Sequence, residues 1–289
     1  MSPISRRQFL GATVGAAVLA GRDAANSEGV GAVAEFDFPI QDLHVHLDRS
    51  TLDAVLALSK ERNVTFGIVE HAGTKENQYP VVLSNDAELT AYLQMLEGKP
   101  ALKGIQAEWI DWMGCFSPAA LAGLDFVLSD AMTLSGKDGQ RAKLWEKGVE
   151  IGDPQVFMDR YVDWHVKVMT EEPLDILANV TWLPDNLVAD YDALWTEPRM
   201  TKVIETAVKQ EIALEISSGY NLPKLPFLKL AKSAGAKFTF GSNGRYPKMG
   251  LLDYPLQIAR EFSLTRADMF LPTPGGAKIA RRSADKHGT

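Results

Sequence analysis

Residues 42–48 read Asp42-Leu43-His44-Val45-His46-Leu47-Asp48 and follow the apolar run from Phe36 to Ile40, a pattern typical of the end of a buried strand. Side chains two apart in a strand point to the same side, so we expect His44 and His46 to project together. Paired imidazoles at one strand end are a compact way to hold a divalent metal ion. The alternative is that ordinary hydrogen bonds satisfy both rings. The chain has only 5 histidines, so two in one short stretch favour metal binding.

Runs of the same kind recur along the chain and predict further strands. They are apolar throughout rather than alternating, as expected for parallel strands that are covered on both faces. We identify seven strand candidates: Ile40–His46, Thr65–Glu70, Leu102–Glu108, Asp125–Asp130, Asp175–Val180, Ile212–Ser217 and Lys237–Ser242.

Helix-like segments separate these strands. The expected helices are Thr51–Arg62, Asp86–Leu96, Asp153–Glu171, Met200–Gln210, Pro226–Ala234 and Leu251–Phe262, with Asn85 or Asp86 as a plausible N-cap of the second. Strand followed by helix, repeated without an obvious linker, predicts an α/β fold of the TIM-like barrel type. A doubly wound open sheet is the alternative.

Composition bounds the function. The chain has 289 residues, of which 46% are hydrophobic, enough for one large core or two small ones. Its net charge is −7 and its pI about 5.3, and no basic stripe is present, so we expect no nucleic-acid partner. The single cysteine, Cys115, cannot form an intramolecular disulfide.

The N-terminus is typical of a targeting segment. Ser5-Arg6-Arg7-Gln8-Phe9-Leu10 resembles the twin-arginine export signal, and the apolar run Phe9 to Ala20 is short for a membrane span. Ala32-Val33-Ala34 is an A-x-A type cleavage site. We therefore expect a signal peptide at 1–34, a barrel domain at 35–271 and a flexible tail at 272–289. The mature protein would be periplasmic or secreted, with the twin-arginine export machinery as a partner and no stable membrane span.

Polar residues close almost every candidate strand. In a TIM-type barrel the functional groups lie at the carboxyl ends of the strands. A purely structural barrel does not need such a recurrence of groups able to ligate a metal or move a proton. The groups are His44, His46, Glu70, His71, Glu108, Asp130, Asn179, Thr181, Glu215, Ser242 and Asn243.

This constellation resembles the PHP (polymerase and histidinol phosphatase) family of metal-dependent hydrolases. Asp42-Leu43-His44-Val45-His46 is similar to its first motif, D-x-H-x-H, and Val69-Glu70-His71-Ala72 places a His where the second motif has one. Gly104-Ile105-Gln106-Ala107-Glu108-Trp109 is similar to the third motif, whose Glu bridges metals. The resemblance covers Pro39 to Phe270 and implies a distorted seven-stranded barrel, (β/α)7, with divalent metal ions of zinc, manganese or iron.

The resemblance departs from the family at several ligand positions. Asn243 and Arg245 stand where the last motif supplies an Asp and a His, and Asp130 and Asn179 follow strands that usually end near a His. Neutral Asn is a poorer ligand than a carboxylate for a divalent cation. The resemblance therefore implies a mononuclear site made by His44, His46 and Glu108, to which Asp130 could add. Two His and one carboxylate with an open position is the usual catalytic zinc arrangement.

Three further residues are candidates for catalysis. His71 could be a second ligand or a proton donor, or it could cap a loop. Asp130 could ligate or act as a general base, or it could be an N-cap. Arg245 suits phosphate or carboxylate oxygens through its planar fork, or it could be a surface residue of a loop. Trp109, Trp112 and Tyr220 could wall a pocket for a ring or carbohydrate substrate, although core packing is the more common use.

Two functions follow. The first is an exported metal-dependent hydrolase in which metal-activated water attacks a small-molecule substrate, anionic if Arg245 binds it. A phosphoester is the expected substrate, and an amide or lactone is the alternative suggested by the related amidohydrolases. The second is a catalytically degenerate barrel that binds a ligand or partner without turnover.

Overall fold

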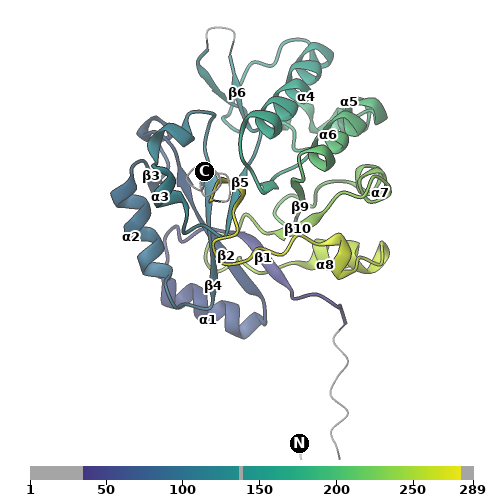
Figure 1. Ribbon diagram of the computed structural model, residues 1–289. Helices are drawn as coiled ribbons and strands as arrows, with labels where there is room; N and C mark the ends of the chain where they lie inside the picture. Colours follow the sequence, from purple (N-terminus) through teal and green to yellow (C-terminus); the bar gives the residue numbers. More distant parts are fainter. Residues whose placement is uncertain (1–34, 137–138, 281–289) are drawn as a thin grey trace, which may run out of the picture. The chain divides into compact units, whose positions relative to one another are not determined.

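The computed structural model describes residues 35–136 and 139–280 (Figure 1). The described residues from Phe36 onward belong to one compact unit. The predicted export signal and its cleavage site, and residues 281–289 of the expected tail, lie outside the described residues.

The core of this unit is a parallel barrel that confirms the predicted α/β fold. Within the described residues, seven strands pair in the order β1-β2-β4-β5-β8-β9-β10, each parallel to its neighbour. Their bounds are β1 Gln41–Val45, β2 Thr65–Ala72, β4 Ala101–Ala107, β5 Phe126–Ser129, β8 Ile176–Leu177, β9 Ala213–Ser217 and β10 Phe238–Gly241. Every strand predicted from the sequence is present. The strands follow one another in chain order and β1 contacts β10, which excludes the doubly wound sheet.

Helices lie outside the strands (Figure 1). The six predicted helices are α1 Leu52–Arg62, α2 Asp86–Leu96, α4 Pro154–Glu171, α6 Glu197–Lys209, α7 Leu225–Ser233 and α8 Asp253–Glu261. The Asn85 side chain caps α2 by accepting a hydrogen bond from the Glu88 N–H at 3.0 Å.

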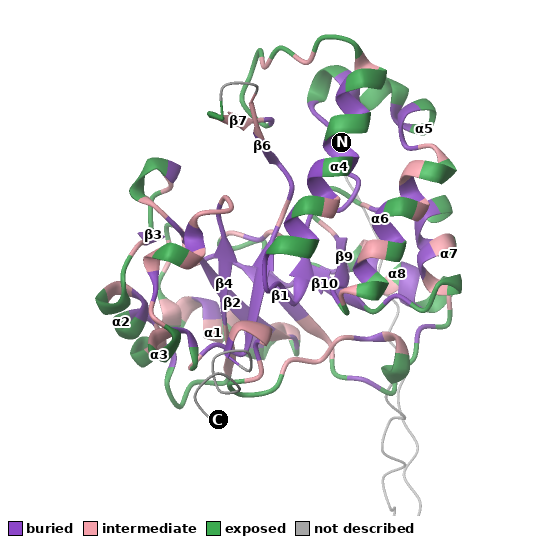
Figure 2. Ribbon diagram, turned by 45° about the horizontal axis from the view of Figure 1, so that its top comes forward, coloured by how far each residue is buried: buried purple, intermediate pink, exposed green. Residues whose placement is uncertain are grey.

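Several short elements were not predicted. They are β3 Val82–Leu83, β6 Thr133–Ser135, β7 Arg141–Lys143, α3 Pro118–Leu121, α5 Tyr191–Leu194 and the 3₁₀ turns η1 Lys75–Asn77, η2 Trp112–Cys115, η3 Asp185–Asp190 and η4 Arg266–Asp268. Strands β6 and β7 form an antiparallel ribbon on the connection from β5 to α4 (Figure 2).

The barrel interior is apolar along the strands and becomes polar toward their carboxyl ends. A cluster that includes Leu43, Val69, Phe126 and Ile176 draws its members from separate strands. Side chains alternate along a strand, so the next inward positions toward the carboxyl end belong to polar residues such as His71 after Val69. The larger hydrophobic cluster packs the strands against the helices. The polar side chains at the carboxyl ends of the strands therefore lie on a packed apolar core.

Asp42 closes the barrel between its first and last strands. One carboxylate oxygen accepts the Ser242 N–H at 2.9 Å, and the other accepts the Ser242 hydroxyl at 2.5 Å and the Gly250 N–H at 2.7 Å. The backbone of Gly244 also bonds His44 and His46, at 3.0 Å each. The register of β1 shifts between Asp42 and Val45, an irregularity that includes His44 and ends just before His46.

Residues 272–280, which fall in the segment expected to be a loose tail, pack on the barrel. The Gly275 N–H donates to Asp125 at 2.9 Å, and the Lys278 ammonium donates to the Glu211 carbonyl at 2.7 Å. Ala277 is buried. Among the described helices, none is long and apolar enough to cross a membrane.

Candidate active site

His44 is fixed from both sides at the carboxyl end of β1. Its Nδ1 atom lies 2.7 Å from Glu215 Oε1, and its Nε2 atom lies 3.1 Å from Gln106 Oε1. Both acceptors are oxygens, so the ring donates from both nitrogens, as only the imidazolium can. Burial opposes that charge, but Glu215, together with Asp130 and Asp42, outweighs burial and raises the pKa of His44.

Asp130 receives two side-chain amides. The Gln106 amide donates to its Oδ2 atom at 3.4 Å and the Asn179 amide at 3.1 Å, while the Met132 N–H donates to Oδ1 at 2.9 Å. Burial, with the nearby Glu108 carboxylate, raises the pKa of Asp130 to about 6. The neutral amide of Gln106 thus connects His44 to Asp130, and the neutral amide of Asn179 binds the same Asp130 oxygen.

His46 and His71 offer ring nitrogens that have no hydrogen-bond partner. Both nitrogens of His46 and the Nε2 atom of His71 are buried and unpaired among the described residues. The two rings stack with centroids 4.6 Å apart. Burial lowers the pKa of His46 well below its usual value, and burial with the Arg245 charge lowers the pKa of His71 to about 3. Both rings are neutral at pH 7, the form that binds metals.

Glu108 lies directly after β4 and holds the other nitrogen of His71. Its Oε1 atom is 2.7 Å from His71 Nδ1, and its Oε2 atom accepts the Tyr79 hydroxyl at 3.3 Å. The Tyr79 ring stacks on His71 with centroids 3.6 Å apart. Burial raises the pKa of Glu108 to about 8. In this arrangement Glu108 orients His71 rather than joining His44 and His46.

Arg245 extends across the same end of the barrel from the segment after β10. Its Nε atom donates to Asp48 at 3.2 Å, and one terminal nitrogen donates to the Asn243 side chain at 2.7 Å. The guanidinium is partly exposed and places a fixed positive charge near His46 and His71. Asp48, which lies in the turn after β1, pairs with this arginine.

A cavity of about 200 Å³ opens over these groups. His71, Asp130 and Arg245, the three residues predicted to be catalytic, all line it, so the structure brings them together at one place. Tyr220 also lines it, as expected for a pocket wall, whereas Trp112 is fully buried and donates to Glu172 at 2.8 Å. The lining is completed by Tyr79, Gln106, Met132, Trp145, Asn179 and Asn243.

The predicted ligands do not form a preformed metal site. Within residues 35–136 and 139–280, no group of three or more His, Cys, Asp or Glu side chains is arranged to hold a metal ion. His44 and His46 are close, with ring centroids 5.3 Å apart, but Glu108 is engaged with His71 and Tyr79. Metal ligation by His44, His46 and Glu108 stays a prediction.

Sequence reasoning missed three residues that shape the site. Gln106 is a buried polar residue in the apolar second half of β4, which is the signal that could have found it. Tyr79 and Trp145 do not directly follow any of the seven barrel strands, and no local pattern marks them.

Comparison with solved structures agrees with this architecture. The chain is similar to the crystal structure of histidinol phosphate phosphatase from Lactococcus lactis subsp. lactis Il1403, complexed with zinc, L-histidinol and phosphate. The TM-score is 0.53 at 15% identity, and the match covers 82% of this chain and 98% of that chain. The two proteins share a fold. This likeness agrees with the PHP-type barrel suggested by the motifs.

A second structure is much less similar. The HpcH/HpaI aldolase from Desulfitobacterium hafniense DCB-2 matches with a TM-score of 0.37 at 10% identity, over 78% of this chain and 91% of that chain. No protein family model and no curated protein matches the sequence.

Proposed function

We propose that this protein is a metal-dependent hydrolase of small phosphoesters that works at the mouth of the barrel. One observation carries the proposal: His46 and His71 present buried, neutral, unpaired ring nitrogens beside a cavity that also holds Asp130 and Arg245. Buried polar atoms are almost always paired, so unpaired nitrogens indicate a missing partner.

The donor chemistry fits a divalent ion such as zinc, manganese or iron. Imidazoles that bind metals usually donate their other N–H to an oxygen acceptor, and Nδ1 of His44 and of His71 faces a side-chain oxygen of Glu215 and of Glu108, respectively. We therefore expect His46 and His71 to hold the ion, with His44 as a third ligand once its Nε2 atom has lost its proton and left Gln106. When bound, the ion would lower the pKa of a water molecule and polarise the substrate.

The remaining roles belong to groups of the chain itself. Arg245 would bind non-bridging phosphate oxygens through its guanidinium fork. Asp130, held by two amides, is the candidate for proton transfer, because its pKa of about 6 lies close to neutral pH. In the overall reaction water adds to phosphorus, the ester P–O bond breaks, and the alcohol leaves with a proton.

Metal content of the purified protein tests this function. We expect about one equivalent or more of zinc, manganese or iron by elemental analysis, lost in His46→Ala and retained in a control, His165→Gln, which changes a buried histidine outside the cavity. Hydrolysis of a phosphomonoester should fall with the metal. Protein that takes up no metal, even from an excess, would exclude the metal-dependent reaction.

The second candidate is a barrel that binds an anionic ligand without turnover. Two features favour it. His44 donates from both nitrogens, and Arg245 places near His46 a fixed positive charge that a metal ion would otherwise provide. Phosphate binding by a metal-free protein that shows no turnover would support this candidate over the hydrolase.

We further propose that the protein is exported by the twin-arginine route to the periplasm or beyond. Ser5-Arg6-Arg7-Gln8-Phe9-Leu10 and Ala32-Val33-Ala34 support it. Changing Arg6 and Arg7 together to Lys should retain the full-length chain in the cytoplasm. Normal export and processing of that variant would contradict the proposal.

A further inference from the structure

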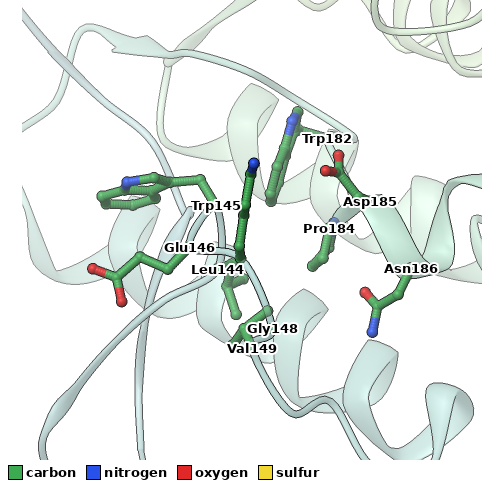
Figure 3. Close-up of a pocket in the computed structure, with 10 residues that line it drawn as sticks. Leu144, Trp145, Glu146, Gly148, Val149, Trp182, Pro184, Asp185 and Asn186 are labelled. Carbon is green, nitrogen blue, oxygen red and sulfur yellow. The ribbon is translucent and has the colours of Figure 1, made fainter.

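A second cavity, of about 240 Å³, lies beside the first (Figure 3). In Figure 3, Trp145 and Glu146 lie on one side of it, and Trp182, Pro184 and Asp185 lie on the other. Apart from Trp145, the residues that line the first cavity do not line this outer cavity, and nothing in the proposed hydrolysis uses it.

The two cavities share a wall. Trp145 lines both of them. Trp182 lines the outer cavity, and its ring lies 6.4 Å from the ring of Tyr220, which lines the inner one. The loop after β8 supplies Asn179 to the inner cavity and Trp182 to the outer cavity. Within this loop the backbone N–H of Trp182 donates to the backbone carbonyl of Asn179 at 3.0 Å.

A series of stacked rings leads from the barrel centre to Trp145. His46 stacks on His71, His71 on Tyr79, and Tyr79 on Trp145, with successive centroids 4.6, 3.6 and 6.3 Å apart. This series runs from the unpaired imidazoles at the barrel centre to the indole that faces both cavities. A molecule anchored at Arg245 therefore has an aromatic surface along which to extend into the outer cavity.

The outer cavity combines apolar faces with hydrogen-bonding groups of both kinds. Trp145 is 37% exposed, so its face is open to a ligand. Asp185, which lies beside Trp182 in Figure 3, supplies acceptors, and Lys147 supplies donors. A neutral ring with an apolar face and several hydroxyl groups can pack on the indole rings and use both the acceptors and the donors.

We propose that the outer cavity binds a neutral polyhydroxylated ring, so that the substrate is a sugar monophosphate spanning both cavities. This rests on the proposed function for its phosphate end, which Arg245 would hold in the inner cavity. The sugar end depends only on Trp145, Trp182 and the polar groups around them.

Binding by three phosphonates tests the proposal, because none of them can lose phosphate by hydrolysis. The probes are methylphosphonate, benzylphosphonate and the phosphonate analogue of glucose 6-phosphate, measured by titration calorimetry with the full mature protein. We expect the glucose analogue to bind roughly tenfold tighter than methylphosphonate, as about two net hydrogen bonds would give. Asp185→Ala should remove most of that difference and leave methylphosphonate binding unchanged.

Asp190→Ala is the matched control, because it removes an exposed carboxylate from the same 3₁₀ turn, η3, without touching either cavity. Circular dichroism should show both variants folded. Equal affinity for the glucose analogue and methylphosphonate would overturn the proposal, and so would benzylphosphonate binding tightest with no effect of Asp185→Ala. If no phosphonate bound but free glucose did, and Asp185→Ala abolished it, the sugar site would stand and the phosphoester function would fall.

Discussion

The Nδ1 atom of His44 lies 2.7 Å from Oε1 of Glu215, although 171 positions separate the two residues in the sequence. The other oxygen of Glu215 accepts the Asn179 N–H at 2.8 Å. One buried carboxylate thus connects the end of β1, the loop after β8 and strand β9. The contact with Glu215 sets the orientation of the His44 ring, the first histidine of the D-x-H-x-H motif.

Replacing this carboxylate tests its part in metal binding. Glu215→Gln keeps the size of the side chain and one acceptor oxygen but removes the charge that faces His44. We expect metal affinity to fall about 10- to 100-fold, as for other carboxylates behind a ligating His. Competition with a chromogenic chelator would measure it, with exposed Glu205→Gln as control. Unchanged affinity in Glu215→Gln would show that His44 is not a ligand.

Arg245→Gln tests anion binding. The guanidinium lines the inner cavity, whereas Lys248 is an exposed cation three residues further along that does not line it. A charge-assisted contact is worth about 1.5–3 kcal/mol, so we expect inorganic phosphate to bind about 10- to 100-fold more weakly. Titration calorimetry would measure this loss. Lys248→Gln should bind phosphate normally, and an equal loss in both variants would indicate only a general electrostatic effect.

His165 gives a pH dependence that is separate from the site. It is buried in α4 with Nδ1 2.7 Å from the Tyr161 carbonyl oxygen, and burial lowers its pKa to about 4. The folded protein disfavours the charged ring, so stability present above the unfolded pKa of about 6.5 is lost as pH falls toward 4.

The variant His165→Gln isolates the contribution of His165 to the pH dependence of stability. Between pH 7 and pH 4.5 the free energy of unfolding of the native chain should fall by about 2–3 kcal/mol more than that of His165→Gln, which does not titrate. Urea unfolding at the two pH values would measure the difference. Parallel loss in both proteins would mean that His165 is protonated in the folded state at ordinary cost.

Gly104 lets Phe126 pack inside the barrel. A Cβ atom at Gly104 would lie 2.4 Å from an atom of the Phe126 ring, whereas one at Gly114 would meet nothing within 4 Å. Overpacking a core typically costs about 1–3 kcal/mol, so Gly104→Ala should lower the free energy of unfolding by that amount. Denaturant unfolding would measure it, and Gly114→Ala should unfold much as the native chain does. Equal stability of both variants would show that the floor of the barrel can adjust.

The strands were predictable because their physical signal is local. Parallel strands buried on both faces are apolar throughout, and each candidate in this chain was such a run, from Ile40–His46 to Lys237–Ser242. The β6–β7 ribbon carried no such signal, because its strands are short and β7 is only half-buried. Residues 272–280 were misjudged for a related reason: their contacts to Asp125 and Glu211 are made by backbone and charge, which no apolar period reveals.

The site was predictable only in part. The convergence of His71, Asp130 and Arg245 followed from their places at strand ends, since parallel strands bring their carboxyl ends to one edge. Which partner each residue takes did not follow. Glu108 had been expected beside His44 and His46, and in the structure it holds His71, because side-chain direction decides hydrogen bonds between strands.

By itself, the sequence determined the barrel and which end of the barrel can carry out chemistry, because the apolar pattern of each strand is visible in consecutive residues. Only the tertiary structure decided that Glu215 orients His44, that Gln106 connects His44 to Asp130, and that Trp145 and Trp182 line an outer cavity. These relationships join residues from different strands and loops, and their distances depend on how the whole barrel closes.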